Sequence, residues 1–339
     1  MVVGSLPSIP ARLHRIVSKH VRTINTSTRP ACAIVHVSVV IATYAPELYE
    51  HCCEAIESVL QQKYDDVDVI VVVDGDESLC ARARNDLDAV DRITVLCNDE
   101  NLGLSASRNR AIEVAIGDVV AFMDDDAVAE PTWIEELVRA YTERDAIAAG
   151  GPMTPIWVAE RPRFFPEEFY WLVGVTHPGF AEPWEEVRNT FGSNISVKRD
   201  VLCELGGFES RVGRRGEMNL QAEEPELGLR MQREFGRGVV YNPDAKVGHK
   251  VFAYRTDLWW LVNRCFWQGY SKRVMERLAS DVSTEESQYL RALLTRFVPR
   301  RVKSLLVRPR LEKLLQLVTL LLFTGVVGVG YLYAVLRER

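Results

Sequence analysis

The fold of this 339-residue chain is most easily inferred from the segment Gly117-Asp118-Val119-Val120-Ala121-Phe122-Met123-Asp124-Asp125-Asp126-Ala127. An apolar run, Val119–Met123, is short enough for a buried strand, and three carboxylates follow it at once. Because adjacent carboxylates repel one another and burial disfavours their charge, hydrogen-bond donors or a divalent metal must hold them ionised. Asp124 and Asp126 project to the same side of an extended chain, so both can reach one Mg2+ or Mn2+ ion. The alternative is a solvated acidic turn that caps the next helix.

The pattern of an apolar run followed by polar residues recurs along the first half of the chain. Strands are expected at 36–43, 67–73 and 93–96, with helical patterns between them. This alternation predicts an α/β fold with a mostly parallel sheet and helices on both faces. Ligands of such sheets bind beyond the carboxyl ends of the strands. The polar residues expected at those ends are Thr43, Asp74, Asp76, Asn101 and the acidic cluster 124–126.

Charge is segregated along the sequence. Residues 1–30 carry five basic side chains and no acid, and residues 291–339 carry ten basic and two acidic side chains. Of the 41 basic and 47 acidic side chains in the chain, 26 and 45 therefore lie in residues 31–290, a net charge of −19. Such an acidic middle would be repelled by phosphate backbones, so we expect no nucleic acid among the partners.

The seven cysteines are scattered, odd in number and without a Cys-x-x-Cys spacing. This usage indicates reduced thiols in a cytoplasmic protein rather than a disulfide framework or a zinc site. Residues 1–35 are expected to be a basic, loosely ordered tail, and no secretory signal is visible in them.

The segment 314–336 runs for twenty-three residues without a charge. That length is about what a helix needs to cross ~30 Å of hydrocarbon, so we predict a single transmembrane helix near the C-terminus. Three glycines, Gly325, Gly328 and Gly330, leave a hairpin or an interfacial helix as alternatives. Eight Lys and Arg residues precede the segment between 291 and 313, which predicts a cell-membrane protein with its large domain in the cytoplasm.

Further candidate site residues lie in the middle of the chain. Arg108 falls near the acidic edge and could grip a diphosphate, or it is an ordinary surface ion-pair partner. Glu223 and Glu224 begin a helix, where either could deprotonate an acceptor hydroxyl or merely complement the helix dipole. His249 could complete the ligands of a metal, although a lone histidine is more often structural. Aromatic residues between 157 and 184 could wall a sugar or lipid pocket or form a satellite core.

Taken together, these residues resemble a family 2 glycosyltransferase of GT-A fold over about Val37 to Gly269. Each motif is short, and their order along the chain carries the resemblance. The motifs are Val37-Ser38-Val39-Val40-Ile41-Ala42-Thr43-Tyr44, Ser58-Val59-Leu60-Gln61-Gln62-Lys63-Tyr64, Val73-Asp74-Gly75, Asn101-Leu102-Gly103, Ala106-Ser107-Arg108-Asn109, Gly117-Asp118 through Asp126, Gly192-Ser193-Asn194 and Glu223-Glu224-Pro225-Glu226-Leu227.

The resemblance implies a role for each matching residue. Thr43 and Asp74 would contact the donor nucleotide, and Arg108 would contact its base or phosphates. Asp124 and Asp126 would hold the ribose and the metal, and His249 would lie on the metal side. Glu224 would be the catalytic base.

Two departures from the family pattern affect these assignments. The family commonly has Asp-Asp where this chain has Asp74-Gly75, so Asp76 is the alternative nucleotide contact. The usual Glu-Asp is here Glu223-Glu224, which leaves either glutamate as the base.

The stretch 268–272 and the apolar tail are similar to archaeal enzymes that add hexuronic acid to dolichyl-phosphate-linked sugars in N-glycosylation. The resemblance therefore implies an inverting, metal-dependent transferase that moves a sugar, with UDP-glucuronate as the expected donor, onto a lipid-linked saccharide at the membrane. The expected organisation is a tail (1–35), a nucleotide-sugar half (36–150), an acceptor-binding and catalytic half (151–275), a basic juxtamembrane region (276–313) and the transmembrane helix (314–336).

Three other functions remain open. One is a different family 2 transferase that makes cell-surface polysaccharide. Another is a sugar-phosphate nucleotidyltransferase, which would need a Gly-rich basic loop where this chain has 42–46, Ala-Thr-Tyr-Ala-Pro. The third is a membrane-tethered binding module without catalysis.

Overall fold

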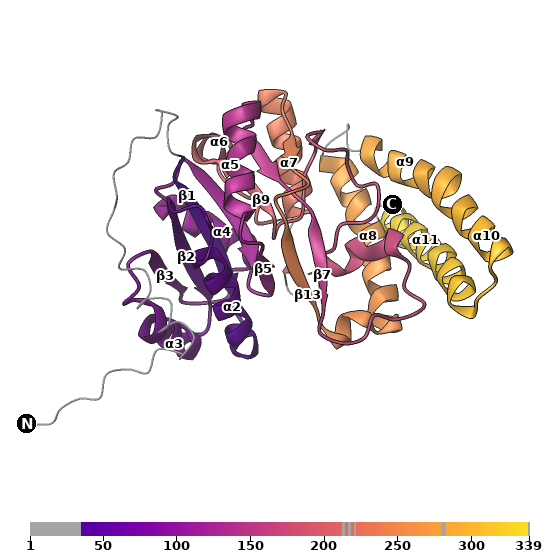
Figure 1. Ribbon diagram of the computed structural model, residues 1–339, viewed down its shortest axis with the longest axis horizontal. Coiled ribbons are helices and arrows are strands. Elements are labelled where there is room, and N and C mark those ends of the chain that lie inside the picture. The colour runs from indigo at the N-terminus through magenta and orange to yellow at the C-terminus, as the bar shows by residue number, and fades with distance from the viewer. Residues whose placement is uncertain (1–34, 212–213, 216–217, 220–221, 279–282, 338–339) are drawn as a thin grey trace, which may run out of the picture.

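The computed structural model describes residues 35–211, 214–215, 218–219, 222–278 and 283–337. The predicted basic tail, apart from its last residue, and Cys32 lie outside these ranges. Figure 1 shows the α/β part of the molecule on the left and a group of helices from the C-terminal part on the right.

A central sheet organises the described part of the chain. Its strand order is β3-β2-β1-β4-β9-β6-β12-β8, and β1, β2, β3 and β4 pair in parallel, as predicted. The strand β9 is antiparallel to both of its neighbours. The strands are β1 (Val37–Thr43), β2 (Val67–Asp74), β3 (Ile93–Asn98), β4 (Val119–Asp124), β6 (Ala148–Gly150), β8 (Glu186–Val187), β9 (Ile195–Lys198) and β12 (Val239–Tyr241).

A second, smaller sheet has the strand order β5-β13-β7. It consists of β5 (Ala127–Ala129), β13 (Val247–Val251) and β7 (Met153–Trp157), and it pairs Ala127 with His249. The acidic cluster and His249 are therefore neighbours because β5 follows the cluster directly and pairs with β13. A two-stranded ribbon joins β10 (Arg214–Arg215) to β11 (Met218–Asn219).

Helices cover both faces of the central sheet. On one face, α2 (Tyr49–Leu60), α3 (Glu77–Leu87) and α5 (Trp133–Arg144) pack against alternate residues of β1 and β2. On the other face, α4 (Leu104–Val114), α6 (Arg199–Leu205) and α7 (Glu223–Phe235) pack against the intervening residues. β1 and β2 are buried almost throughout because both of their faces are covered, which explains their continuous apolar sequence.

The C-terminal helices form a third layer beside the sheet. This layer comprises η2 (Glu167–Val173), α8 (Leu258–Leu278), α9 (Ser283–Ala292), the π-helix η4 (Leu293–Phe297), α10 (Val298–Val307) and α11 (Leu311–Arg337). Their shared core includes Phe165, Phe169, Leu261, Phe297 and Phe323. The short helices η1 (Pro46–Leu48) and η3 (Ala253–Thr256) lie in loops near the strand ends.

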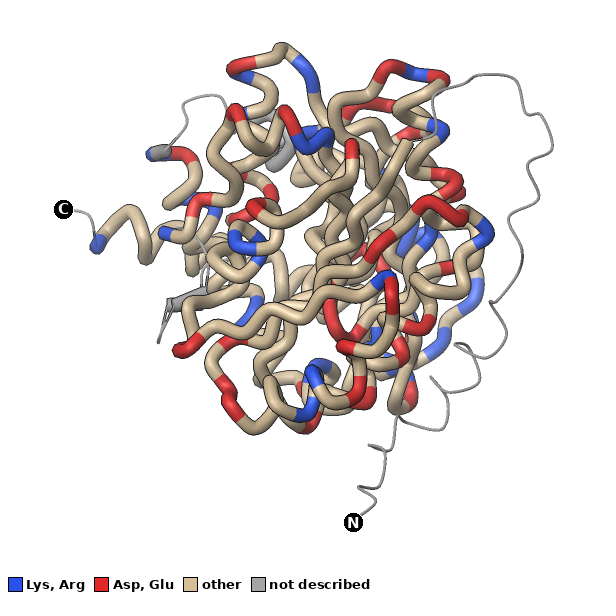
Figure 2. Tube along the Cα trace, turned by 90° about the vertical axis from the view of Figure 1, so that its left-hand side faces the viewer, with Lys and Arg blue, Asp and Glu red and all other residues tan. Residues whose placement is uncertain are grey.

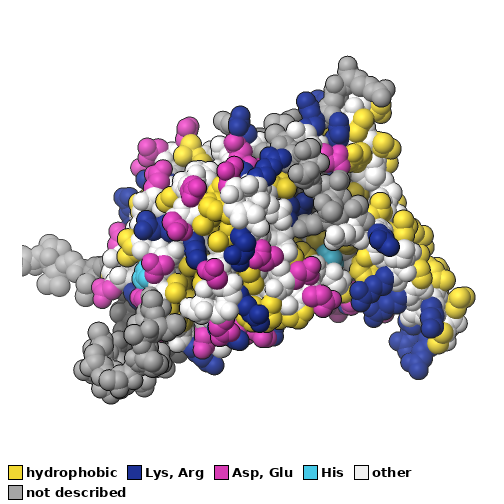
Figure 3. Space-filling model, turned by 90° about the horizontal axis from the view of Figure 1, so that it is seen from above, with side chains coloured by type: hydrophobic (Ala, Val, Ile, Leu, Met, Phe, Trp, Pro, Cys, Tyr) yellow, Lys and Arg dark blue, Asp and Glu magenta, His cyan; other side chains and the backbone are white. Residues whose placement is uncertain are grey.

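Among the described residues, α11 alone is long and apolar enough to cross a membrane. Its inner face buries Gln316, Thr319, Leu320 and Phe323, whereas its outer face exposes Leu314, Leu315, Val318, Leu321, Leu322, Val329 and Leu332. Hydrophobic and Lys or Arg side chains lie side by side at this end of the molecule, on the right in Figure 3. At the opposite end, which Figure 2 faces, Asp and Glu are interspersed with Lys and Arg.

The expectation that the cysteines are reduced is wrong for one pair. Cys80 of α3 and Cys97 of β3 form a disulfide, with a Cα–Cα distance of 5.9 Å. The other described cysteines, Cys52, Cys53, Cys203 and Cys265, are free. Spacing in the sequence does not reveal the pair, because α3 packs on β3 only once the sheet has formed.

Candidate active site

A cavity of about 1320 Å3 lies at the carboxyl ends of β1, β2 and β4. Its walls include all but one of the residues that the sequence singled out. These lining residues are Thr43, Asp74, Arg108, Asp124, Asp126, Glu223, Glu224 and His249. The exception is Asp76, which is not among the residues that line this cavity.

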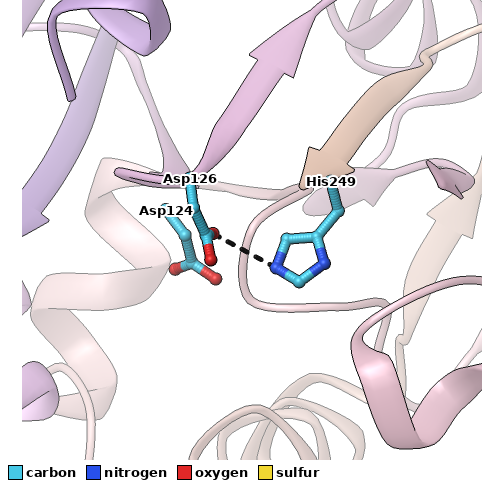
Figure 4. Close-up of side chains that lie close together, drawn as sticks. All are labelled: Asp124, Asp126 and His249. Carbon is cyan, nitrogen blue, oxygen red and sulfur yellow. Dashed lines mark ion pairs between the residues drawn. The ribbon is translucent and has the colours of Figure 1, made fainter. Parts of the chain in front are cut away.

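Asp124, Asp126 and His249 bring their ligand atoms within 4.8 Å of one another (Figure 4). The strand β4 ends at Asp124, and the imidazole comes from β13, with His249 Nε2 at 3.2 Å from Asp126 Oδ1. Two carboxylates and an imidazole are a donor set that suits Mn2+ and that Mg2+ also accepts through its oxygens. The arrangement therefore fits a divalent metal, and the solvated-turn alternative does not hold because Asp126 is buried.

Arg255, which the sequence did not single out, completes this cluster. Its guanidinium donates to Asp126 Oδ2 at 2.7 Å and lies 3.2 Å from His249 Nε2. Burial alone would raise the pKa of Asp126, but His249 and Arg255 beside it hold that pKa below its usual range. Asp126 is therefore kept as a carboxylate, the form that binds a cation.

Asp125 lies between these two aspartates and differs from them. Burial, together with the charges of its two neighbours, raises the pKa of the Asp125 carboxyl to about 7. Within the described structure its Oδ2 and the nearby hydroxyl of Thr43 are buried without hydrogen-bond partners. Both residues line the cavity, and these two atoms are buried within its wall.

Asp74 fixes the loop that follows β3. Its carboxylate accepts hydrogen bonds from the backbone N–H of Leu102 at 3.0 Å and of Gly103 at 2.9 Å, and from the Asn98 amide at 2.7 Å. The loop carries Asn101 and Gly103 to the cavity wall and starts α4. Asp74 thus lines the cavity and also holds in place the loop that carries Asn101 and Gly103 to it.

The departure at Gly75 has a geometric cause. Gly75 has φ +81°, and a Cβ there would overlap the backbone of Asn101. An aspartate at this position would be strained as well as crowded. Asp76, the alternative nucleotide contact, instead caps α3 by accepting from Leu79 N at 2.7 Å, so its predicted role has no support from the cavity.

Arg108 is buried, with 2% of its surface exposed, so it is not a surface ion-pair partner. Its guanidinium donates to Glu224 Oε1 at 2.8 Å, to Asp124 Oδ1 at 3.2 Å and to the carbonyl of Gly192 at 3.0 Å. One cation therefore ties the acidic strand end to the start of α7. The carboxylates of Asp124 and Glu224 are therefore both bonded to the same guanidinium group.

The segment Gly192-Ser193-Asn194 forms hydrogen bonds that hold the end of β4 and the neighbouring elements in place. The Ser193 hydroxyl accepts the backbone N–H of Asp124 at 2.9 Å. Asn194 accepts from the Trp133 indole at 2.8 Å and donates to the carbonyl of Ala245 at 2.8 Å. A Cβ at Gly192 would overlap the carboxylate of Glu224, so this position must lack a side chain.

Both glutamates at the start of α7 line the cavity. The Glu224 side chain is 18% exposed and shares Arg108 with Asp124. Glu223 is more buried, at 5% exposed. Glu224 is thus the more accessible of the two glutamates to an acceptor, and its bond to Arg108 fixes its orientation.

The aromatic segment around η2 contributes both to a hydrophobic core and to the wall of the cavity, the two alternatives predicted from its sequence. Phe165 belongs to the core shared with α8 and α11, Phe169 belongs to that core and also lines the cavity, and Trp171, His177 and Phe180 line the cavity.

Arg255, Trp260, Arg264 and Glu276 were missed because no pattern within a loop or a charged helix shows which side faces the strand ends. Gln268 and Lys272 lie in the stretch 268–272 that the resemblance included.

The sequence of this chain matches the model of glycosyl transferase family 2 over residues 38–206. It is 49% identical over 304 residues to the glucosyl-dolichyl phosphate glucuronosyltransferase of Haloferax volcanii, covering 89% of this chain and 97% of that protein. It is 35% identical over 149 residues to glycosyltransferase AglD of the same organism, which covers 41% of this chain and 23% of AglD.

The fold is similar to that of the mannosyltransferase PcManGT from Pyrobaculum calidifontis, solved with GDP-Man and Mn2+. The TM-score is 0.57 at 17% sequence identity, and the match covers 95% of this chain and 93% of that one. The expected GT-A fold is therefore confirmed. With a relative of nearly half identical sequence over almost its whole length, the chain belongs to glycosyltransferase family 2.

Proposed function

We propose that this enzyme transfers glucuronic acid from UDP-glucuronate to a glucosyl-dolichyl phosphate acceptor, with inversion at the anomeric carbon. The acceptor and the sugar are those named for the Haloferax volcanii relative, whose match covers 89% of this chain. The observation that carries the proposal is a single cavity that holds the metal-ligand cluster, Arg108 and Glu224 and continues to the apolar helix α11.

The donor diphosphate would lie at the carboxyl ends of β1 and β4. Asp124, Asp126 and His249 would hold Mn2+ or Mg2+ there, and the bound ion would neutralise the charge that develops on the departing diphosphate. Arg255 stands beside the same ligands and adds a fixed positive charge. The nucleoside would extend toward Thr43, Asp74 and the loop at Asn101, which form the adjoining wall.

Glu224 would act as the base. In the transfer step its carboxylate takes the proton of the acceptor hydroxyl while the acceptor oxygen bonds to the anomeric carbon. The bond from that carbon to the phosphate oxygen breaks at the same time, and its electron pair leaves with UDP. A single displacement of this kind inverts the anomeric configuration. Arg108 orients the base through its bond to Glu224 Oε1, leaving the second carboxylate oxygen for the acceptor.

The membrane is the expected source of the acceptor. α10 carries the exposed side chains of Arg300 and Lys303 beside the exposed apolar side chains of Leu306 and Val307, a combination that favours an anionic lipid surface. α11 adds the exposed apolar face described above. We propose that these two helices hold the enzyme on the cytoplasmic face of the cell membrane.

A transfer assay with purified enzyme tests this proposal. The donors are UDP-glucuronate, UDP-glucose and UDP-N-acetylglucosamine, each radiolabelled, and the acceptors are glucosyl-dolichyl phosphate and dolichyl phosphate, all with Mn2+. We expect label in the lipid phase only with UDP-glucuronate and the glucosylated lipid. Transfer from another donor with none from UDP-glucuronate would overturn the sugar assignment, and transfer to dolichyl phosphate itself would overturn the acceptor assignment.

A further inference from the structure

The helix α8 presents a ridge of polar side chains to the cavity. Trp260, Arg264, Gln268, Lys272 and Glu276 all line it, and their spacing of four residues places them on one face of the helix. Leu261, Cys265 and Met275 are buried on the same side of the helix, between these residues. The cavity-facing side of α8 is therefore its packed side, and none of the ridge residues is needed for the proposed transfer chemistry.

The ridge carries two cationic side chains and one acid, Glu276, whereas acids outnumber cations at the catalytic end. The catalytic end holds the carboxylates of Asp124, Asp125, Asp126, Glu223 and Glu224. The ridge brings in two cationic side chains, Arg264 and Lys272, with Gln268 between them. Two cations separated by eight helical residues lie about 12 Å apart at their Cα atoms, and both side chains are long enough to reach an anion over Gln268. At the catalytic end Arg108 and Arg255 are already bonded to these carboxylates, whereas Arg264 and Lys272 can attract an anionic group to the ridge.

The cavity continues from the ridge onto α11. Thr324, Val327, Gly328, Tyr331 and Leu332 of α11 line it beside α8. The two helices touch at the backbone, because a Cβ at Gly269 would overlap the carbonyl of Val327, and a Cβ at Gly330 would overlap that of Phe266. Tyr331 also donates to Glu276 at 2.7 Å. The ridge is therefore fixed directly beside the helix whose outer face is apolar and exposed.

The lining of the cavity thus contains three kinds of wall: an acidic and polar wall at the strand ends, a cationic wall on α8 and a largely apolar wall on α11. An isoprenoid-linked sugar has three matching parts, namely a saccharide, an anionic phosphodiester and a hydrocarbon chain. We propose that Arg264 and Lys272 bind the phosphate of the lipid-linked acceptor, with its hydrocarbon chain along α11 and its sugar at Glu224. This inference rests on the proposed function and names the acceptor site for it.

The test compares acceptors with and without the phosphate in the full-length enzyme. The phosphate-bearing acceptor is glucosyl-dolichyl phosphate, and the neutral one is an alkyl glucoside of matched solubility. The variants are Arg264→Gln, Lys272→Gln and the double substitution, with Arg277→Gln as the matched control because Arg277 is exposed on α8 and does not line the cavity. The readout is the ratio of kcat/KM for the two acceptors, which cancels general damage to the fold.

We expect each single substitution to lower this ratio by about tenfold, since a hydrogen bond to a charged group contributes at least that factor. The double variant should lower the ratio further through a higher KM for the phosphate-bearing acceptor, with the KM for UDP-glucuronate unchanged. Arg264→Lys should recover part of the loss because it keeps the charge, and Arg277→Gln should match the wild type.

Three results would overturn the inference. One is an unchanged ratio in the double variant, and another is a rise in the KM of the donor in place of the acceptor. The third is competition by inorganic phosphate at concentrations similar to those of the lipid, which would identify a site for free phosphate. If the wild type transfers glucuronate to neither acceptor, the proposed function itself fails, which separates the two outcomes.

Discussion

The guanidinium of Arg108 links three parts of the site that lie far apart in the sequence. It bonds to Glu224, to Asp124 and to the carbonyl of Gly192, and it is almost fully buried. Beside it are the rings of Phe122 and Phe208, at 5.6 Å and 5.2 Å from its Cζ to their centroids. A buried cation in this position is tolerated because two carboxylates compensate it.

Gly192→Ala tests this arrangement without removing any charged group. The new methyl group would overlap the carboxylate of Glu224, so we expect Glu224 to leave Arg108 and transfer to fall by about tenfold or more, the effect of misplacing a base. Gly206→Ala is the control, because nothing lies within 4 Å of a Cβ there and only its positive φ is strained. Full activity in Gly192→Ala, measured by transfer kinetics, would show that the orientation of Glu224 does not matter.

Glu224→Gln separates the role of a base from that of a helix cap. The substitution keeps the shape of the side chain, so donor binding should persist while kcat falls by roughly 10²–10⁴-fold, the usual contribution of a positioned base. Glu223→Gln is the matched comparison and should do less, because Glu223 is the more buried of the two. If Glu223→Gln were the inactive variant, Glu223 would be the base; if both stayed active, the base would lie elsewhere.

Asp126→Ala should abolish transfer and weaken the binding of Mn2+. The loss follows from removing a carboxylate that Arg255 and His249 already hold in place, and stabilisation of the leaving group by an ion contributes several kcal/mol. Asp118→Asn is the control, since it lies just before the same strand at its other end and is exposed. Binding of Mn2+ measured by electron paramagnetic resonance should be lost only in Asp126→Ala, and unchanged transfer in the presence of EDTA would refute the metal site.

Among the helices, α8 and α11 pack in backbone contact at Gly269 and Gly330, so a membrane that surrounds α11 must also lie close to α8. α8 carries Lys272, Arg273, Glu276 and Arg277 in its last turns, and α11 buries Gln316 and Thr319 on its inner face. A crossing α11 would draw the end of α8 toward the hydrocarbon, where each charge costs about 2.5–3.5 kcal/mol. We therefore expect α11 to lie along the membrane surface, while its length and composition also allow the predicted single crossing.

A peptide tag fused after residue 339 tests the orientation of α11. In sealed vesicles with the cytoplasmic face outward, we expect a protease to remove the tag without detergent, because an interfacial helix keeps both of its ends on one side. A second tag at the N-terminus reports the side of the catalytic domain. Protection of the C-terminal tag until detergent is added, with the N-terminal tag digested, would establish the single crossing instead.

The elements that the sequence predicted best are the ones with both faces covered. The continuous apolar runs of β1, β2 and β4 predict buried strands, because an exposed position would leave these side chains in water. The antiparallel position of β9 between β4 and β6 was not predictable, since pairing across some 70 residues depends on the completed sheet. Arg255 likewise reaches Asp126 only because η3 follows a strand from the second sheet.

For the whole molecule, the carboxyl ends of the parallel strands form one wall of the cavity and the C-terminal helices form another. Residues separated by more than 100 positions, such as Arg108 and Glu224, meet in this cavity. The sequence could locate the strand ends and so the acids at them, but not the depth of the cavity or the part that α8 and α11 take in it. Those depend on the backbone contacts at Gly269 and Gly330.

We propose that this cavity carries out a metal-dependent single displacement onto a lipid-linked sugar. The most direct measurement is the anomeric configuration of the new bond, determined by nuclear magnetic resonance on product made from α-linked UDP-glucuronate and glucosyl-dolichyl phosphate. The account predicts a β-linked glucuronosyl product that forms with Mn2+ and does not form in EDTA. An α-linked product, or the same yield in EDTA, would contradict it.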